Sequence, residues 1–382
     1  MTKIAIVTAA TNTIPRFRED MLDEFVRRGC EVVVFGDESE GEWASYFEAH
    51  GAGYRSYSVS RNGMNPASDV KTQRALEALL REERPDKVFT YQAKPNIYGA
   101  LAAAKAGDLE AYAMMGGLGS VFHAHDAKSR IVRRIVSRQY RRAFRHVKRV
   151  FFQNGEDVDT FEGLGIVDAS KVVMTRGSGV NLERFPARPM PGRPSFLFVG
   201  RLVRGKGILD YLEAARMVRA LRPEVEFHVV GAFDTNPTAL SEGELQEYVA
   251  DGTVTYHGEQ KAEDVQRFVE RCTAFVLPSY YGEGTPKSAL EAMATGRPLI
   301  VADAVGCREV VRDGENGFLV PPRCPQAIAD AMERLAADPA LAARMGAASR
   351  RMAEEVFDVR KVNAVICETM GIGAIGARGG SE

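Results

Sequence analysis

Short apolar runs alternate with helix-like segments along most of this chain, and this alternation constrains the fold more than any other feature. Runs rich in Val, Ile, Phe and Ala, bounded by polar residues or glycine, are typical of buried parallel strands. They cover residues 3–9, 31–36, 86–91, 111–116 and 149–154, and then 195–200, 226–231, 254–258, 274–279 and 298–303. Segments between them, such as 16–30 and 68–84, have helical patterns. The sequence therefore predicts an α/β protein with doubly wound parallel sheets.

A Pro- and Gly-rich break, MPGRPS, separates the two series of strands at residues 190–195. A chain of 382 residues is also longer than one typical core. We therefore expect two Rossmann-like domains, 1–190 and 191–355, followed by a segment, 356–382, whose helix returns towards the first domain and whose end is a frayed tail. Because ligands of open α/β sheets bind beyond the carboxyl ends of the strands, a central cleft between the two domains is the expected site.

The composition is that of a soluble globular protein. Hydrophobic residues make up 45% of the chain and charged residues 26%, and a formal net charge of −1 gives no sign of a nucleic-acid partner. The N-terminus reads as a strand rather than a signal peptide, and no apolar run is long enough to span a membrane, so we expect a cytoplasmic protein. The cysteines are scattered, and we expect neither disulfides nor zinc: Cys30, Cys272, Cys307, Cys324 and Cys367.

The stretch YYGEGTPKSALEA, residues 280–292, reads as a loop that turns into a helix. Thr285 suits the N-cap and Pro286 the first helical position. The start of such a helix offers free backbone N–H groups, which favour phosphate. Glu283 then lies at the mouth of that site, and Glu291 lies about two turns further down the helix. An acid beside phosphate is unfavourable unless it binds another group, such as sugar hydroxyls; the alternative is a solvated loop acid and an ordinary helix acid.

A second phosphate-site candidate is the strand, Gly-rich loop and helix of residues 195–218. Gly200 to Lys206 spells G-x-x-x-x-G-K, but Gly207 stands where a P-loop needs a Ser or Thr hydroxyl for Mg²⁺, so we do not expect a P-loop NTPase. Arg201 and Lys206 could instead bind a diphosphate and neutralise its charge as it leaves. The alternative is two surface cations at a strand-to-helix turn.

Three segments together resemble the donor half of the retaining glycosyltransferases of family 4, which have the GT-B fold. They are VGRLVRGKG (199–207), YGEGTPKSALEAMATGRPLIVAD (281–303) and VGCREVVRDGENGFLVPP (305–322). The resemblance covers essentially the whole chain and implies a nucleotide-sugar, most often UDP-linked, as donor. Chemistry in this family generally needs no metal. Retention is attributed to front-face attack, in which the leaving diphosphate takes the proton of the acceptor, so the resemblance implies neither a cofactor nor a protein base.

The same resemblance implies roles for residues at matching positions. Arg201 and Lys206 match the pair that binds the diphosphate, and Glu283 matches the acid near the donor sugar; these are the catalytic candidates. Glu291 matches the residue that bonds the ribose hydroxyls. The other donor-binding candidates wrap the sugar and phosphates: Gly200, Gly284, Thr285, Pro286, Lys287 and Ser288.

The N-terminal half resembles bacterial transferases of surface-polysaccharide and protein-glycan assembly, which add an N-acetylhexosamine, often GalNAc in α1,3 linkage, to an undecaprenyl-diphospho-sugar. The segments that carry this resemblance are 56–70, 89–103, 114–122, 150–165 and 177–186. It implies a lipid-linked saccharide acceptor. The acceptor-binding candidates are Arg16, Arg18, Lys94, Asn96, Gly117, Gly119 and His123, with His125 as the alternative histidine. The chain departs from the family where it has Ala9-Ala10 and Gly306-Cys307 in place of Gly pairs.

Residues 128–149 form a basic segment with ten Lys and Arg and no acid. Its apolar residues recur at helical spacing, and we expect this stripe to pack on the sheet: Ile131, Val132, Ile135, Val136, Tyr140, Ala143, Phe144 and Val147. An anionic bilayer would relieve the repulsion among the cations, by about 1 kcal/mol for each. RNA is the rival partner, but the aromatic platform that single strands need is absent. We predict contact with the inner face of the cell membrane through Arg130, Arg133, Arg134, Arg138, Arg141, Arg142 and Arg145.

The sequence thus favours a transferase that moves a hexose or N-acetylhexosamine to a lipid-linked sugar. Two enzymatic alternatives stay open. One has the same fold and donor but a soluble acceptor, and the other is a sugar-nucleotide epimerase. A non-catalytic binding subunit is the third alternative, although the donor-site positions are chemically intact.

Overall fold

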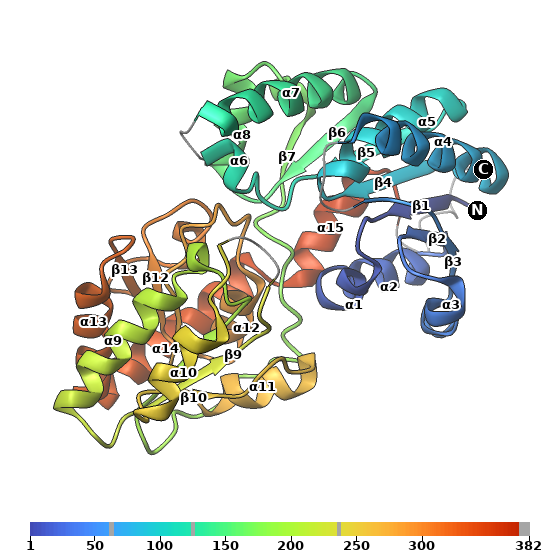
Figure 1. Ribbon diagram of the computed structural model, residues 1–382. Helices are drawn as coiled ribbons and strands as arrows, with labels where there is room; N and C mark the ends of the chain where they lie inside the picture. The colour runs from blue at the N-terminus through green and yellow to red at the C-terminus, as the bar shows by residue number, and fades with distance from the viewer. Residues whose placement is uncertain (61–64, 124–126, 235–237, 374–382) are drawn as a thin grey trace. The chain divides into compact units, whose positions relative to one another are not determined.

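Figure 1 shows two compact units, each built around one sheet with helices on both faces. The computed structural model describes residues 1–60, 65–123, 127–234 and 238–373. Unit 1 comprises Met1–Ser178 and the chain from Arg360 onward, and unit 2 comprises Gly179–Val359. The strand pairs of both sheets are parallel. The predicted α/β class with two doubly wound parallel sheets is therefore confirmed.

Unit 1 has a sheet of order β3-β2-β1-β4-β5-β6-β7. Alternate side chains enter different cores: in β1, Ile4 and Ile6 pack on one face, and Ala5 and Val7 pack on the other. Burial of both faces explains why the central strands are continuously apolar. The strands are β1 (Lys3–Val7), β2 (Glu31–Gly36), β3 (Ala52–Ser56), β4 (Lys87–Tyr91), β5 (Glu110–Met114), β6 (Val147–Phe152) and β7 (Val172–Met174).

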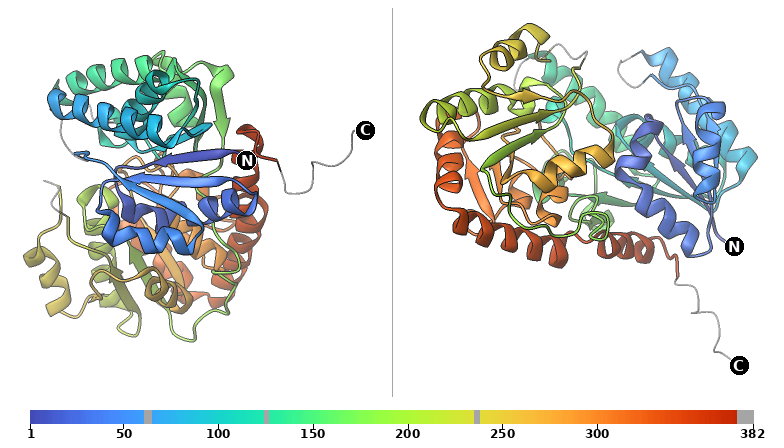
Figure 2. Two further views of the ribbon diagram at one scale, coloured as in Figure 1. Left: turned by 90° about the vertical axis from the view of Figure 1, so that its right-hand side faces the viewer. Right: turned by 90° about the horizontal axis from the view of Figure 1, so that it is seen from below.

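The helices of unit 1 cover both faces of this sheet, as the two views of Figure 2 show. Helices α4, α5, α7 and α8 contribute to one core, and α2, α3 and α15 contribute to the other. The helices are α1 (Ile14–Phe17), α2 (Glu19–Arg27), α3 (Glu40–Ala49), α4 (Pro66–Glu83), α5 (Ala100–Ala106), α6 (Ser120–His123), α7 (Ala127–Phe144), α8 (Gly155–Gly163) and α15 (Val359–Thr369). A short π-helical turn, η2 (Pro95–Gly99), leads into α5.

Unit 2 has a sheet of order β10-β9-β8-β11-β12-β13 and one large core. Its strands are β8 (Ser195–Val199), β9 (Glu226–Val230), β10 (Thr255–Tyr256), β11 (Ala274–Leu277), β12 (Leu299–Ala302) and β13 (Gly317–Val320). Its helices are α9 (Ile208–Leu221), α10 (Glu242–Ala250), α11 (Ala262–Arg271), α12 (Lys287–Ala294), α13 (Pro325–Ala337) and α14 (Pro339–Val356). A capping box of Ser241 and Glu244 begins α10 and satisfies two backbone N–H groups.

The division between the units lies earlier than the predicted boundary at residue 190. Val180 forms a backbone bridge with Asp358, and Phe185 belongs to the core of unit 2. Residues 179–190 are therefore part of unit 2, because their hydrogen bonds and apolar contacts are made there.

The C-terminal helix α15 packs on unit 1, beside α1 and α2 in Figure 1. Ile366 and Met370 enter a core of that unit, and Asn363 Nδ2 donates to the carbonyl of Asp20 at 2.9 Å. The segment expected to be a frayed tail lies largely outside the described residues, which end at 373.

Two further expectations need correction. The single helix predicted over 16–30 is two helices, α1 and α2, because the backbone of Arg18 leaves the helical region at φ −136° while its side chain is buried. Three edge strands, β3, β7 and β13, were not predicted. In β3, buried and exposed residues alternate, so this edge strand has no continuous apolar run.

Candidate active site

The strand order of unit 2 places a topological switch point beside β8. The chain passes from β8 to β9 on one side and reaches β11 on the other, so the loops after β8 and β11 diverge at the carboxyl edge of the sheet. Ligands of open α/β sheets bind at such points. Lys206 follows β8, in the short 3₁₀ turn η4 (Arg204–Lys206), and Glu283 lies in the loop after β11. The fold thus brings two residues predicted for the same site together.

Lys206 and Glu283 form an ion pair with 2.6 Å between Lys206 Nζ and Glu283 Oε1. Their side chains are only 16% and 15% exposed, so Glu283 is not the solvated loop acid of the alternative interpretation. Ser279 Oγ donates to the same carboxylate at 3.0 Å. Burial acts to raise the pKa of Glu283, but the charge of Lys206, the two hydrogen bonds and the charge of Arg201 together lower it. The site therefore holds an ionised carboxylate next to a cation.

Arg201 has a partner that the sequence did not indicate. Its Nη1 lies 2.7 Å from Asp234 Oδ2, and its guanidinium lies 5.5 Å from the centre of the Tyr281 ring. Burial acts to lower the pKa of Arg201, but hydrogen bonds to Asp234 and Tyr281 outweigh it, so the pKa is raised. The side chain is 48% exposed, so this cation is accessible at the carboxyl edge of the sheet. Asp234 follows β9, and only the fold brings it beside the loop after β8.

Two glycines allow the loops of this site to approach each other. Gly207 has φ +75° and ends the turn that carries Lys206. Gly306 has φ +76°, and a Cβ there would lie 2.3 Å from the carbonyl oxygens of Glu283 and Gly284. Cys307, which stands where the family resemblance implies a second Gly, is fully buried, and burial raises the pKa of its thiol. The Cys307 side chain therefore belongs to the core of unit 2, where its Sγ lies 3.5 Å from the carbonyl oxygen of Ser279.

Helix α12 begins one residue later than predicted. Pro286 has an extended ψ of 115° and is the N-cap, so Thr285 precedes the cap and lies buried in the loop. Lys287 Nζ donates to the carbonyl of Gly179 at 2.8 Å, and Ser288 Oγ donates to that of Val199 at 3.4 Å. Glu291 lies within α12, Gly284 lies buried in the loop before it, and Gly200 directly follows β8.

The acceptor candidates Lys94 and Asn96 have structural contacts in unit 1. Lys94 Nζ lies 2.8 Å from Asp69 Oδ1, and both side chains are almost buried. Asn96 is 1% exposed; it accepts a hydrogen bond from Thr90 Oγ1 at 2.7 Å and donates to the carbonyl of Met114 at 2.9 Å. Lys94 is therefore a nearly buried, ion-paired cation, and Asn96 has its hydrogen-bonding groups inside the fold rather than at a surface.

The remaining acceptor candidates are more scattered. Arg18 is 5% exposed, its guanidinium lies 5.6 Å from the centre of the Tyr91 ring, and its Nε has no hydrogen-bond partner among the described residues. Arg16 is exposed on α1. Gly117 and Gly119, with φ of +106° and +71°, lie in the loop after β5. His123 ends α6, and His125 lies outside the described residues.

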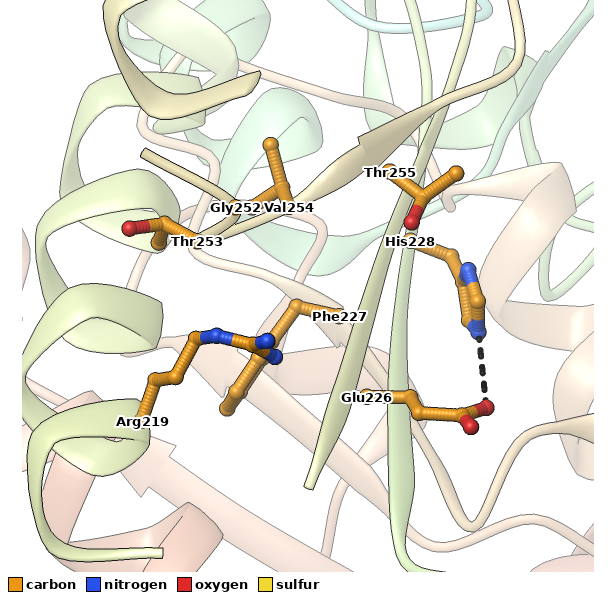
Figure 3. Close-up of a pocket in the computed structure, with 8 residues that line it drawn as sticks. All are labelled: Arg219, Glu226, Phe227, His228, Gly252, Thr253, Val254 and Thr255. Carbon is orange, nitrogen blue, oxygen red and sulfur yellow. Dashed lines mark ion pairs between the residues drawn. The ribbon is translucent and has the colours of Figure 1, made fainter. Parts of the chain in front are cut away.

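A pocket elsewhere in unit 2 is not part of this site. It has a volume of about 320 Å³, and Figure 3 shows the eight residues that line it. Glu226, Phe227 and His228 come from the amino end of β9, whereas the predicted donor residues follow the carboxyl ends of strands. None of the predicted site residues lines this pocket.

In the part of the chain that the structure describes, no group of three or more His, Cys, Asp and Glu side chains is arranged to hold a metal ion. Over the same residues, no helix is both long enough and apolar enough to cross a membrane.

Both halves of the chain match models of known protein families. Residues 181–352 match the family described as glycosyl transferases group 1, and residues 13–177 match the glycosyl transferase 4-like domain. The chain is 27% identical to the N,N'-diacetylbacillosaminyl-diphospho-undecaprenol alpha-1,3-N-acetylgalactosaminyltransferase of Campylobacter jejuni, over 83% of this chain and 84% of the relative. It is 32% identical to the D-inositol 3-phosphate glycosyltransferase of Streptomyces avermitilis, but over only 46% of this chain and 42% of that relative.

Solved structures support the fold. Sucrose-phosphate synthase from Thermosynechococcus elongatus superposes with a TM-score of 0.77 at 19% identity, covering 97% of this chain and 98% of that one. HepE of Anabaena, in complex with UDP, gives a TM-score of 0.76 at 18% identity, with 97% and 100% covered. Between them, the two family matches account for most of both units. The chain therefore belongs to the GT-B glycosyltransferases, with a glycosyl transferase 4-like domain followed by a glycosyl transferases group 1 domain.

Proposed function

We propose that this glycosyltransferase moves a hexose or N-acetylhexosamine from a UDP-sugar to a sugar on a polyprenyl diphosphate, with retention of configuration, at the inner face of the cell membrane. The observation that carries the proposal is the Lys206–Glu283 pair at the switch point of unit 2, with Arg201 on the same loop as Lys206. The acceptor class follows the Campylobacter relative, whose name specifies an undecaprenol-linked substrate and which is similar over most of its length.

The two cations act on the leaving group. When the bond between the anomeric carbon and the diphosphate oxygen breaks, negative charge grows on that oxygen, and Lys206 and Arg201 stabilise it. The acceptor hydroxyl attacks the same face of the sugar, and its proton passes to the departing diphosphate. This scheme requires no protein base and no metal. Each cation already has an acidic neighbour, Glu283 or Asp234, so the site carries no large uncompensated positive charge before the donor binds.

Glu283 has a positioning role in this scheme. Its pKa is lowered, so it can accept hydrogen bonds from hydroxyls of the donor sugar at neutral pH. Glu291 on α12 binds the ribose hydroxyls, and the backbone around the start of α12 contacts the phosphates, where free N–H groups favour an anion.

The test is a panel of donors and acceptors. Purified protein is incubated with UDP-, GDP- and dTDP-sugars, with and without an undecaprenyl-diphospho-monosaccharide, and nucleotide release and lipid mobility are both followed. We expect release to depend on the lipid and on one UDP-sugar, and the anomeric coupling constant of the product to match that of the donor.

The other outcomes separate the alternatives. Release with a soluble sugar acceptor but not with the lipid would overturn the proposed acceptor and leave the donor site standing. Conversion of the UDP-sugar without any acceptor would indicate an epimerase. An inverted product would overturn the front-face scheme.

A further inference from the structure

The basic helix α7 has an exposed apolar pair that the sequence pattern did not predict. The stripe was expected to pack on the sheet throughout, and its second half does so: Tyr140 and Phe144 are each 2% exposed and lie in the same core as Val150 and Phe152 of β6. In the first half, Ile131 is 63% exposed and Ile135 is 48% exposed. The expectation is wrong for these two residues, which stand one turn apart on the solvent side of the helix.

Some cations of the segment have structural partners. Arg133 Nη1 donates to the carbonyl of Phe122 at 2.9 Å, and Arg141 Nε donates to that of Leu164 at 3.0 Å. Lys148 forms an ion pair with Glu110. Arg133 and Arg141, which we predicted to face a membrane, therefore also hold α7 against its own unit.

The other arginines surround the exposed isoleucines. Arg130, Arg134, Arg138 and Arg142 are exposed and recur every four residues, along the ridge next to the two isoleucines. Among the described residues, no acidic side chain forms an ion pair with any of these four. The same face thus carries two apolar side chains and a row of uncompensated positive charge.

We infer that this face of α7 binds an anionic lipid bilayer, with Ile131 and Ile135 inserted among the headgroups and the four arginines on lipid phosphates. A helix with lysine or arginine on its polar side and large apolar residues beside them is suited to the membrane interface. The positive charge would repel the same face of a second copy, and RNA would leave the isoleucines in water. This inference deepens the proposed function by naming the surface that meets the membrane, but it uses no property of the donor site.

The test is co-sedimentation with vesicles that contain no acceptor, made of phosphatidylcholine alone or with 30–40% phosphatidylglycerol, roughly the anionic content that gives surface attraction. The first variant is Ile131→Ser/Ile135→Ser. Its matched control is Met217→Ser/Leu221→Ser, which changes another exposed pair four residues apart, 39% and 75% exposed, on α9 of unit 2. The second variant is Arg134→Gln/Arg138→Gln.

We expect the unmodified protein and the control to bind anionic vesicles and to bind neutral ones much more weakly. The arginine variant should bind about 25-fold more weakly, since each cation contributes about fivefold. The isoleucine variant should lose about tenfold or more, because buried apolar area drives insertion. Thermal unfolding should be unchanged in both, since the altered side chains are exposed.

Equal binding of the isoleucine variant and the control would overturn insertion, even if the arginine variant were weakened. Binding to single-stranded RNA in preference to anionic vesicles would overturn the choice of partner. Transferase activity on a short-chain, water-soluble diphospho-sugar separates this inference from the proposed function. The isoleucine variant should keep that activity, because this acceptor needs no membrane. If the parent protein were inactive, the proposed function would fail but the vesicle result would still stand.

Discussion

The two units have the same sheet arrangement but differ in what occupies their switch points. In unit 2, the loops after β8 and β11 meet through the charged pair Lys206–Glu283. In unit 1, the corresponding loops after β1 and β4 meet through a neutral amide, Gln92, whose Oε1 accepts hydrogen bonds from the backbone N–H of Ala9 at 2.8 Å and from Thr8 Oγ1 at 3.1 Å. The same topology can thus place a reactive pair or a structural bridge at the same point, because the chemistry lies in the loops.

The residues around the switch point of unit 1 also form hydrogen bonds with one another. Gln92 holds a left-handed backbone, φ +75°, which is uncommon for a side chain of this size, and its Nε2 donates to Thr13 Oγ1 at 3.2 Å. The protein's own groups therefore satisfy the switch point of unit 1. The exception nearby is Arg18, with its unpartnered Nε above Tyr91.

Replacement of Lys206 by Ala should have the largest effect on both activity and stability. Loss of one preorganised group that stabilises developing charge typically lowers turnover by about 10²–10³-fold. The same change leaves Glu283 nearly buried without its ion-pair partner, at a cost of up to about 3 kcal/mol in the free energy of unfolding. Steady-state transfer and urea unfolding measure the two effects, with Lys261→Ala, an exposed lysine of unit 2, as control.

The two effects can be separated. Lys206→Met/Glu283→Gln should regain most of the stability, since the charge is removed from both partners, but it should not regain transfer. Transfer by Lys206→Ala at the rate of the control would show that the charged switch point is structural, as that of unit 1 is.

Asn96→Ala, in unit 1, tests for a residue that contributes to stability but not to ligand binding. The change removes hydrogen bonds to Thr90 and Met114 in a position that is 1% exposed, so we expect a loss of about 1–3 kcal/mol in the free energy of unfolding. Affinity for UDP, measured by calorimetry at a temperature where the variant is folded, should be unchanged. Unchanged stability combined with a higher KM for the acceptor would return Asn96 to the acceptor site predicted from the sequence.

Arg18→Met is expected to change stability by no more than about 1 kcal/mol, because among the described residues no carboxylate offsets the desolvation penalty of this buried guanidinium, and Met removes that penalty. Burial lowers the pKa of Arg18 to about 10, so the side chain is still charged at neutral pH. If it binds the acceptor diphosphate, the variant should show a raised acceptor KM with an unchanged donor KM. Kinetics indistinguishable from the parent protein would remove Arg18 from the acceptor candidates and leave the switch-point region of unit 1 without a ligand role.

The sequence was most informative where a short local pattern is enough to determine the structure. Strands buried on both faces are continuous apolar runs, and the loops of the donor site have Gly-rich signatures next to them. Ion pairs between residues distant in the sequence leave no such local pattern. Asp234 pairs with Arg201, and Asp69 with Lys94, only because the fold brings separate segments together. Likewise, nothing in the sequence indicated that Lys94, an acceptor-binding candidate, lies almost buried against Asp69 of α4.

The smallest effect that we predict concerns His228, which lines the pocket of unit 2 (Figure 3), and its neighbour His257. His228 Nδ1 and His257 Nε2 are 3.1 Å apart, and the ring of His257 packs on Phe268. Burial lowers the pKa of His228, although Glu226 acts in the opposite direction, and burial together with His228 lowers the pKa of His257. Both rings are therefore neutral in the folded protein at neutral pH.

The sign of the pH dependence follows from these directions. Below the ordinary histidine pKa of 6.5, the unfolded chain binds protons that the folded pair does not, so stability is lost as pH falls. Between pH 7.5 and 5.5, His228→Phe/His257→Phe should lose less stability than the parent, by a difference of about 2–4 °C in Tm at most. Arg18→Met, in unit 1, should follow the parent over the same range, because arginine does not titrate there. If stability depended on pH identically in the parent and in both variants, the two histidine rings would be protonated inside the fold as readily as in the unfolded chain. The part of unit 2 around these rings would then gain positive charge as pH falls, and it would differ from the charged switch point only near neutral pH.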